Sequence, residues 1–469
     1  MATAATPGGI TDLPAELLHH ICAFLTPACV VKRTPYPCHD CLNRRPGCHQ
    51  WFRGQLHISR LSRTCKALRD AVLPLVFQCY SDAGPSAVRR IILLARTLVA
   101  RPDLRQHVRF IMSGGGHEDI PLEEGQFVRD GIVQLSLPAV PDHWSTDGEP
   151  GYRLLPLELL LAHTPNLEYL RMPLDYDWDL HILPQLVKNH PPLLPALKSL
   201  EVSHYFIAGD RFDISMNAVE TIAAHAPNLE AMCLPDPAFS RGTTFTPLPN
   251  LRKLYWQTPC AANPDALAAM LDAAPRLEVL ALPWDALADN YDYCEDRCTT
   301  DVWKAVECRK DSLRELRLDV RDDTPQGTGE DSERESLTDF AKLEVLMVDG
   351  HALGSLRAVW KRKNKRAKMD SFLSTMFPPS IREVTFWRPD GVELQAAMLR
   401  FAKVVSVGRY PNLKSVVLAP SQKSDRYDDW HNTDEWNGVK LELEEMFGKG
   451  GVKFVLSWDQ PYWKAHRLD

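Results

Sequence analysis

The sequence predicts an α/β protein in which a small all-helical module precedes a solenoid of helix–turn–strand repeats with parallel strands. Three observations predict it. The pattern L-x-x-L-x-L, with other apolar residues at some leucine positions, recurs nine times between residues 167 and 418. A proline precedes most of these matches by two residues, and segments with apolar residues at three- and four-residue spacing precede the prolines. Fourth and sixth positions that are apolar and alternate with other residues are typical of a half-buried strand.

The nine matches follow one another at intervals of 22 to 38 residues, which lies in the range of solenoid repeats. Because one such unit cannot bury both of its faces, neighbouring units must stack on one another. A further strand is expected near Phe454, Val455 and Leu456. The apolar triples are Leu167/Leu170/Met172, Leu197/Leu200/Val202, Leu229/Met232/Leu234, Leu251/Leu254/Trp256, Leu277/Leu280/Leu282, Leu313/Leu316/Leu318, Leu343/Leu346/Val348, Ile381/Val384/Phe386 and Leu413/Val416/Leu418.

A proline stands two residues before the first apolar position in seven of the nine matches. Proline ends a preceding helix and favours extended geometry in the residue before it, so it predicts a tight turn between helix and strand. Helices are predicted in residues 155–167, 217–229 and 263–277, with the pair Asn263-Pro264 at the start of the last one. The seven prolines are Pro165, Pro195, Pro227, Pro249, Pro275, Pro379 and Pro411.

The composition is that of an ordinary globular protein. The 469 residues are 45% hydrophobic and 25% charged, and the net charge of −7 argues against a nucleic-acid-binding role for the whole chain. No apolar run approaches the roughly 20 residues that span a bilayer, and the N-terminus lacks the features of a secretory signal. The twelve cysteines are scattered, most of them in apolar patterns. We therefore expect a protein of the cytoplasm or nucleus.

Two amphipathic helices are predicted near the N-terminus. Residues 10–25, ITDLPAELLHHICAFL, place their apolar residues on one helical stripe after a capping aspartate and a first-turn proline. Residues 56–77 follow the same spacing through Ile58, Leu61, Cys65, Leu68 and Val72, and Pro74 is predicted to end that helix. A third amphipathic helix is predicted after Ser86.

The opening L-P-x-E-L-L-x-x-I-x-x-x-L and the later L-S-x-T-C-K-x-L-R-D resemble an F-box over residues 10–77, and residues 155–420 resemble the irregular leucine-rich repeats of F-box proteins. The implied domains are an F-box at 10–77, a helical linker and entry to the repeats at 78–150, and a solenoid with a C-terminal cap at 151–469. The family joins its first two helices by a short connection, whereas residues 26–55 intervene here.

The resemblance implies a substrate-recognition subunit of an SCF-type ubiquitin ligase, which binds the adaptor protein, through it a cullin, and a target protein. It implies no catalytic role and no cofactor, and the sequence holds no familiar catalytic motif. Carried over residue by residue, the adaptor-binding positions are Leu13, Pro14, Leu17, Ile21, Leu25, Leu61, Cys65 and Leu68.

Positions three and five of each match are predicted to face the open side of the repeats. They combine aromatic residues with charged ones, and aromatic and arginine residues are the usual anchors of protein interfaces. We therefore expect the target protein to contact Tyr169, Arg171, Lys253, Tyr255 and Arg317. Whether the target must carry a phosphate is left open.

Three other interpretations stay open at this point. The chain is a scaffold outside the ligase, or residues 361–368, KRKNKRAK, form a nuclear-localisation or nucleic-acid patch. An enzyme without familiar motifs is a more distant alternative. Within the insertion, Cys29, Cys38, Cys41 and Cys48 could form a tetrahedral zinc site, but they hold one C-x-x-C step and not the spacing of a known finger. Whether they bind zinc is left open, and no metal site is assigned.

Overall fold

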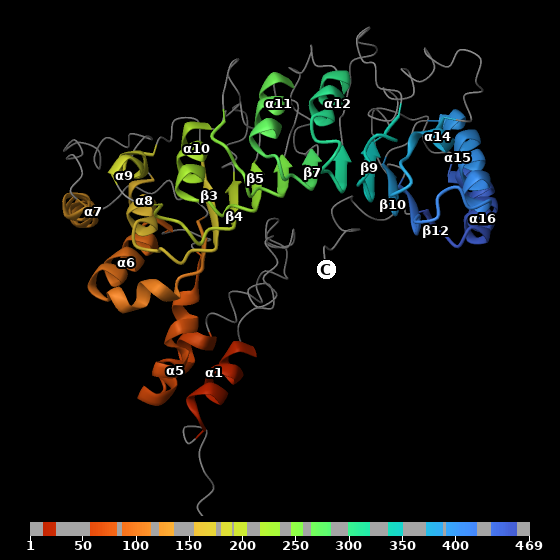
Figure 1. Ribbon diagram of the computed structural model, residues 1–469. Coiled ribbons are helices and arrows are strands. Elements are labelled where there is room, and N and C mark those ends of the chain that lie inside the picture. Colours follow the sequence, from red (N-terminus) through yellow and green to blue (C-terminus); the bar gives the residue numbers. More distant parts are fainter. Residues whose placement is uncertain are drawn as a thin grey trace, which may run out of the picture. The chain divides into compact units, whose positions relative to one another are not determined.

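The computed structural model describes two compact units, Met1–Ala231 and Met232–Asp469. Figure 1 shows the elements of both units, coloured along the sequence. The residues that the structure describes are 13–24, 57–81, 87–113, 122–135, 154–174, 180–189, 192–203, 216–234, 245–256, 264–282, 299–318, 336–349, 372–387, 391–419 and 433–456.

The first unit begins with helices and continues as alternating helices and strands. Helices α6 to α9 pack around one apolar cluster that includes Ile92, Val128, Leu159 and Leu186. The elements are α1 (Ala15–Phe24), α5 (Lys66–Gln78), β1 (Cys79–Ser81), α6 (Ala87–Ala100), the 3-10 helix η3 (Pro102–His107), β2 (Phe110–Met112), α7 (Leu122–Gln134), α8 (Leu155–Leu161), β3 (Tyr169–Pro173), α9 (Leu183–Asn189), β4 (Ser199–Ser203) and α10 (Met216–His225).

Strand β5 (Ala231–Leu234) starts at the last residue of the first unit, and the second unit continues the alternation. Figure 1 shows helices α11 and α12 side by side next to the strands of this unit, and the two helices are in contact. The elements are β6 (Lys253–Trp256), α11 (Pro264–Ala273), β7 (Val279–Leu282), α12 (Thr299–Glu307), β8 (Glu315–Leu318), β9 (Val345–Asp349), α14 (Leu373–Met376), β10 (Glu383–Trp387), α15 (Gly391–Ser406), β11 (Ser415–Ala419), α16 (Thr433–Lys449) and β12 (Lys453–Leu456).

Within each unit the strands lie in the sheet in the order in which they follow one another in the chain. Every described strand pair is parallel, for example β7 with β8, where Leu280 faces Leu316. Such an order needs a crossover connection between neighbouring strands, and helices provide most of these crossovers. The predicted α/β repeat with parallel strands is confirmed, and the predicted final strand is β12.

The core of both units consists of the predicted apolar positions. All three apolar residues of each of the nine matches are at most 5% exposed. Trp256 and Phe386 are the largest of them. At the C-terminal end of the second unit, aromatic rings continue this core, and the rings of Phe447 on α16 and Phe454 on β12 are stacked 5.4 Å apart.

The predicted turns before the strands are tight and uniform. In each of the seven matches with a proline, the amide of the first apolar residue donates to the carbonyl three residues earlier, as Leu251 does to Leu248 at 3.1 Å. The proline then occupies the second position of a four-residue turn, where its fixed φ is favourable. An asparagine follows the proline in several repeats and binds the previous turn: Asn412 Nδ2 donates to the Pro379 carbonyl at 3.0 Å and Asn228 Nδ2 to the Pro195 carbonyl at 2.8 Å.

The single helix predicted over residues 56–77 is wrong in two respects. The chain is helical from His57 to Leu61, turns at Ser62–Thr64, and starts α5 at Lys66. The hydroxyl groups of Ser62 and Thr64 donate to the carbonyls of Ser59 and Leu61, which compete with a continuous helix. Pro74 lies inside α5, which continues to Gln78.

We expect the apolar residue at the fourth position of a match to contribute several kcal/mol to the free energy of unfolding. Leu316 on β8 is fully buried, so Leu316→Ala should lower the free energy of unfolding by about 2–5 kcal/mol. Leu441→Ala on α16, where the leucine is 73% exposed, is the matched control and should change it by less than about 0.5 kcal/mol. Urea denaturation followed by circular dichroism measures both, and equal effects would contradict the assignment of the core.

Candidate functional site

The first candidate surface is formed by α1 and α5, which are in contact. Pro14 precedes α1, and its carbonyl accepts the amide of Leu18 at 3.0 Å in the first helical turn. Cys65 caps α5, because its Sγ accepts the amide of Leu68 at 3.5 Å while its own backbone is extended. Val72 and Leu75 of α5 pack with Ile58, and Leu61 lies against this cluster.

The predicted adaptor-binding residues divide into an exposed and a buried group. On α1, Leu17 and Ile21 lie one helical turn apart and expose 50% and 42% of their surface. Pro14 is also exposed and Leu13 is half-buried. Of the residues from the second helix, Leu68 is buried, and Leu61 and Cys65 are half-buried. Leu25 lies outside the described residues. The exposed group is therefore an apolar patch of Pro14, Leu17 and Ile21.

Helix α5 joins the sheet without a connecting loop. It ends at Gln78, and β1 begins at Cys79. The carbonyl of Gln78 accepts the amide of Arg109 at 2.9 Å, and Cys79 is in register with Phe110 of β2. Helix α5 also contacts η3. The α1/α5 module is thus continuous with the first strands of the repeat.

Strands β1 and β2 precede the first of the nine predicted matches, so the repeat begins earlier than the sequence pattern indicated. Val108 and Ile111 occupy the first and fourth positions of an additional match and are both fully buried. Ser113 stands at the sixth position, where the pattern requires an apolar residue. This polar residue is the reason that the additional match was missed.

The second candidate surface is the sheet face of positions three and five. In the first unit, Arg171 of β3 is in register with Glu201 of β4, and Arg171 Nε lies 3.5 Å from Glu201 Oε1. The Tyr169 hydroxyl donates to the other carboxylate oxygen of Glu201. Burial raises the pKa of Glu201, while Arg171 and Tyr169 act in the opposite direction. Tyr169 and Glu201 are buried, and Arg171 is half-buried.

In the second unit the same face carries the other predicted target contacts. Lys253 and Tyr255 of β6 are half-buried, whereas Arg317 of β8 is buried and paired with Glu315 of the same strand. The sequence pattern treats this face as open, but neighbouring strands lie only about 4.8 Å apart, so adjacent side chains cover one another. That these residues contact a target stays a prediction.

A third feature was not predicted: a row of charged residues at the beginning of the strands. We call a residue a rung when its amide donates to the carbonyl of the corresponding residue in the preceding repeat. Arg252 is included because its carbonyl accepts the amides of Glu278 and Val279 in the following repeat. Most rung carbonyls accept two amides, as Glu278 does from Arg314 at 2.8 Å and from Glu315 at 3.0 Å. The rungs are Arg109, Glu168, Lys198 and Glu230 in the first unit, and Arg252, Glu278, Arg314, Glu344, Arg382, Lys414 and Lys453 in the second.

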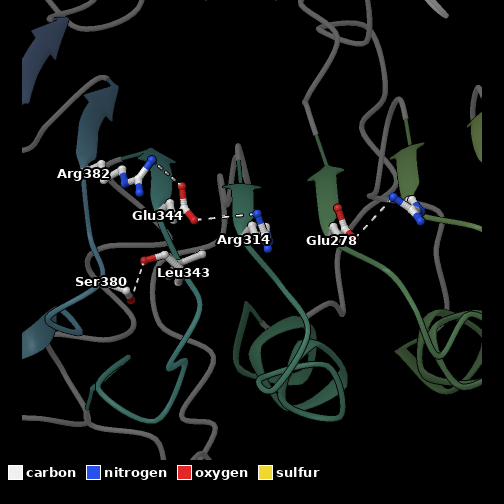
Figure 2. Close-up of polar contacts among 7 residues, drawn as sticks. Glu278, Arg314, Leu343, Glu344, Ser380 and Arg382 are labelled. Carbon is white, nitrogen blue, oxygen red and sulfur yellow. Dashed lines mark hydrogen bonds and ion pairs between the residues drawn. The ribbon is translucent and has the colours of Figure 1, made fainter. Parts of the chain in front are cut away.

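The rung side chains pair along the row, and Figure 2 shows Glu278, Arg314, Glu344 and Arg382 at the beginning of neighbouring strands. Glu344 binds on both sides, to Arg382 Nη1 at 3.1 Å and to Arg314 Nη1 at 3.9 Å. In the first unit, Arg109 Nη1 lies 3.0 Å from Glu168 Oε1. The signal was present in the sequence, because rungs occupy the second position of each match, where acidic and basic residues alternate from Glu168 to Arg382.

Two buried ionisable residues hold the short helix α9. Glu158 of α8 is fully buried and accepts the amides of His181, Ile182 and Leu183 at 3.0, 2.7 and 2.9 Å. Burial raises the pKa of Glu158 to about 7, and the three donors act against this shift. His225 Nδ1 accepts the Leu193 amide, so its Nε2–H donates to the Leu183 carbonyl at 2.9 Å. Burial lowers the pKa of His225.

Several sequence-based hypotheses fall on residues that the structure does not describe. They are the cysteines Cys29, Cys38, Cys41 and Cys48 and the basic segment 361–368. Within the described ranges, no group of three or more His, Cys, Asp or Glu side chains is placed to hold a metal ion. In the same ranges no helix is both long and apolar enough to cross a bilayer.

No protein-family model matches the chain, and a search of curated proteins finds no significant match.

The buried Glu158 carboxyl should make stability depend on pH. Its folded-state pKa of about 7 lies above the ordinary value of 4.5, so the folded chain holds a proton that the unfolded chain has lost. The stabilising contribution is therefore full below about pH 4.5 and disappears as the pH rises through about 7. Urea denaturation at several pH values should show a smaller decrease across this window for Glu158→Gln than for the wild type.

The control for this experiment is Glu123→Gln on α7, an exposed glutamate. It should leave the pH dependence of the wild type unchanged. A wild type and a Glu158→Gln variant with parallel stability curves between pH 4.5 and 7 would contradict the role of Glu158.

Proposed function

We propose that the chain is the substrate-recognition subunit of an SCF-type ubiquitin ligase. In this proposal α1 and α5 act as an F-box that docks to the adaptor protein and, through it, to a cullin. The repeats hold a target protein. The observation that carries the proposal is the apolar patch of Pro14, Leu17 and Ile21, which is exposed on a helix of the module that resembles an F-box.

The exposed patch is the kind of surface that a protein partner covers. A leucine and an isoleucine one turn apart on a helix form a continuous apolar strip, and their burial against a partner is favourable. Leu18, between them in the sequence, is buried within the protein, so α1 has an inner face that holds it in place and an outer face that is free to bind. This division matches the assignment of Leu17 and Ile21 to the adaptor.

The direct junction between α5 and β1 supports the second half of the proposal. A receptor of this class performs no bond chemistry and contributes proximity, which raises the effective concentration of target lysines near the ubiquitin-carrying enzyme. A docking module that continues into the first strand restricts the orientations of a target bound near β1 to β4. In this proposal the chain is non-catalytic and works in the cytoplasm or nucleus.

Co-purification of the full chain with the SCF adaptor tests the proposal. The wild type should form a stable complex, and the double variant Leu17→Ala, Ile21→Ala should bind roughly ten- to a hundredfold more weakly, because two partly exposed anchors are truncated. Since both side chains are about half exposed, the double variant should stay folded, which circular dichroism verifies.

The matched control is Leu93→Ala on α6, where the leucine is 49% exposed. This variant should bind the adaptor as the wild type does. A folded wild-type chain that does not bind the adaptor would sink the ligase proposal and favour a scaffold that acts outside the ligase.

A further inference from the structure

The alternation of rung charges ends in the last repeats of the second unit. From Arg252 to Arg382, basic and acidic rungs alternate without exception. Arg382 is then followed by Lys414 and Lys453, with no acidic rung between them. We call Arg382, Lys414 and Lys453 the basic end.

The three residues of the basic end lie side by side at the beginning of three neighbouring strands. The amide of Lys414 donates to the Arg382 carbonyl at 2.7 Å, and the amide of Lys453 donates to the Lys414 carbonyl at 2.9 Å. Adjacent strands lie about 4.8 Å apart, so the three positive charges are attached within two strand spacings. All three side chains are exposed, and like charges at this separation repel one another.

Among the described residues, Glu344 alone forms an ion pair with the basic end. Glu344 is shared between Arg314 and Arg382. Glu383 follows Arg382 and is half-buried, but it forms no ion pair with the basic end. Neither Lys414 nor Lys453 has an ion-pair partner among the described residues. The basic end therefore has unused capacity for negative charge.

The rest of the row indicates which negative group fits. Between two basic rungs, Glu344 places one carboxylate that binds Arg314 on one side and Arg382 on the other. Arg382, Lys414 and Lys453 lie on three successive strands in the same way, but the middle position, which Glu344 occupies between Arg314 and Arg382, is taken by Lys414. The long flexible stems of the two lysines allow their ammonium groups to reach a carboxylate supplied from outside.

We propose that the basic end of the second unit, Arg382, Lys414 and Lys453, binds an acidic segment of a partner protein, whose Asp or Glu side chains take the place of the absent acidic rungs. This inference rests on the proposed target-binding role of the repeats and names the chemistry of the target. It adds an electrostatic contact at the beginning of β10 to β12, apart from the face of positions three and five.

Binding of a fluorescein-labelled, glutamate-rich peptide to the full chain tests the inference. Fluorescence anisotropy at low and at physiological salt should show binding that weakens as salt is added. The same peptide with glutamine in place of glutamate should not bind. Lys414→Glu supplies the absent acidic rung within the chain, so it should weaken binding by at least about tenfold and raise the melting temperature. Lys453→Glu should also weaken binding by about tenfold.

Lys304→Glu on α12 is the matched control, because it makes the same charge change at an exposed lysine. It should alter binding by less than about twofold. The inference is overturned if the wild type does not bind the glutamate-rich peptide at low salt, or if Lys304→Glu weakens binding as much as Lys414→Glu. It is also overturned if a short RNA binds at the basic end while the glutamate-rich peptide does not.

Adaptor co-purification separates this inference from the ligase proposal. Lys414→Glu should bind the adaptor as the wild type does, because the basic end lies in a different unit from α1. Failure of peptide binding with adaptor binding intact overturns only the basic-end inference. Failure of adaptor binding with peptide binding intact overturns only the ligase proposal.

Discussion

The carbonyl group of each rung residue connects one repeat to the next. Most of these carbonyls accept two amides from the following repeat, as Arg314 accepts those of Glu344 at 2.7 Å and Val345 at 2.9 Å. Two donors on one acceptor leave the next strand only one register. The fourth and sixth positions of adjacent strands therefore lie side by side in the core, as Leu346 and Val384 do. A tight turn leads the chain into this position, and in seven of the nine matches that turn contains a proline.

Because the rung residues are joined by these backbone hydrogen bonds, their charged side chains form a row across the beginning of the strands. An acidic residue next to a basic one stabilises the row modestly, because these pairs are largely exposed. Glu278 and Arg252, 3.9 Å apart with both side chains more than a third exposed, are an example. The same geometry makes like charges at neighbouring rungs unfavourable. The order of charges along the row therefore indicates where rung side chains pair with one another and where they do not.

The sequence predicted the repeat well and the surfaces less well. The strands and the core could be predicted because burial requires apolar residues at fixed positions of the repeat. Leu280 and Val416, at the fourth position of their matches, are examples, and both are fully buried. The first repeat was missed because Ser113 breaks the pattern, and Pro74 was assigned to a helix end although α5 continues past it. The pairing of Tyr169 and Arg171 with Glu201 depends on register between strands, which one sequence does not display.

The uniform connection between neighbouring repeats has a consequence for how each unit folds. Every rung binds only the adjacent repeats, and most neighbouring strands are separated by only a few tens of residues in the chain. Loop closure over such distances costs little more entropy for a long interval than for a short one. Any adjacent pair of repeats in a unit can therefore serve as a nucleus from which order spreads in both directions, and folding does not have to wait for the two ends of the unit to meet.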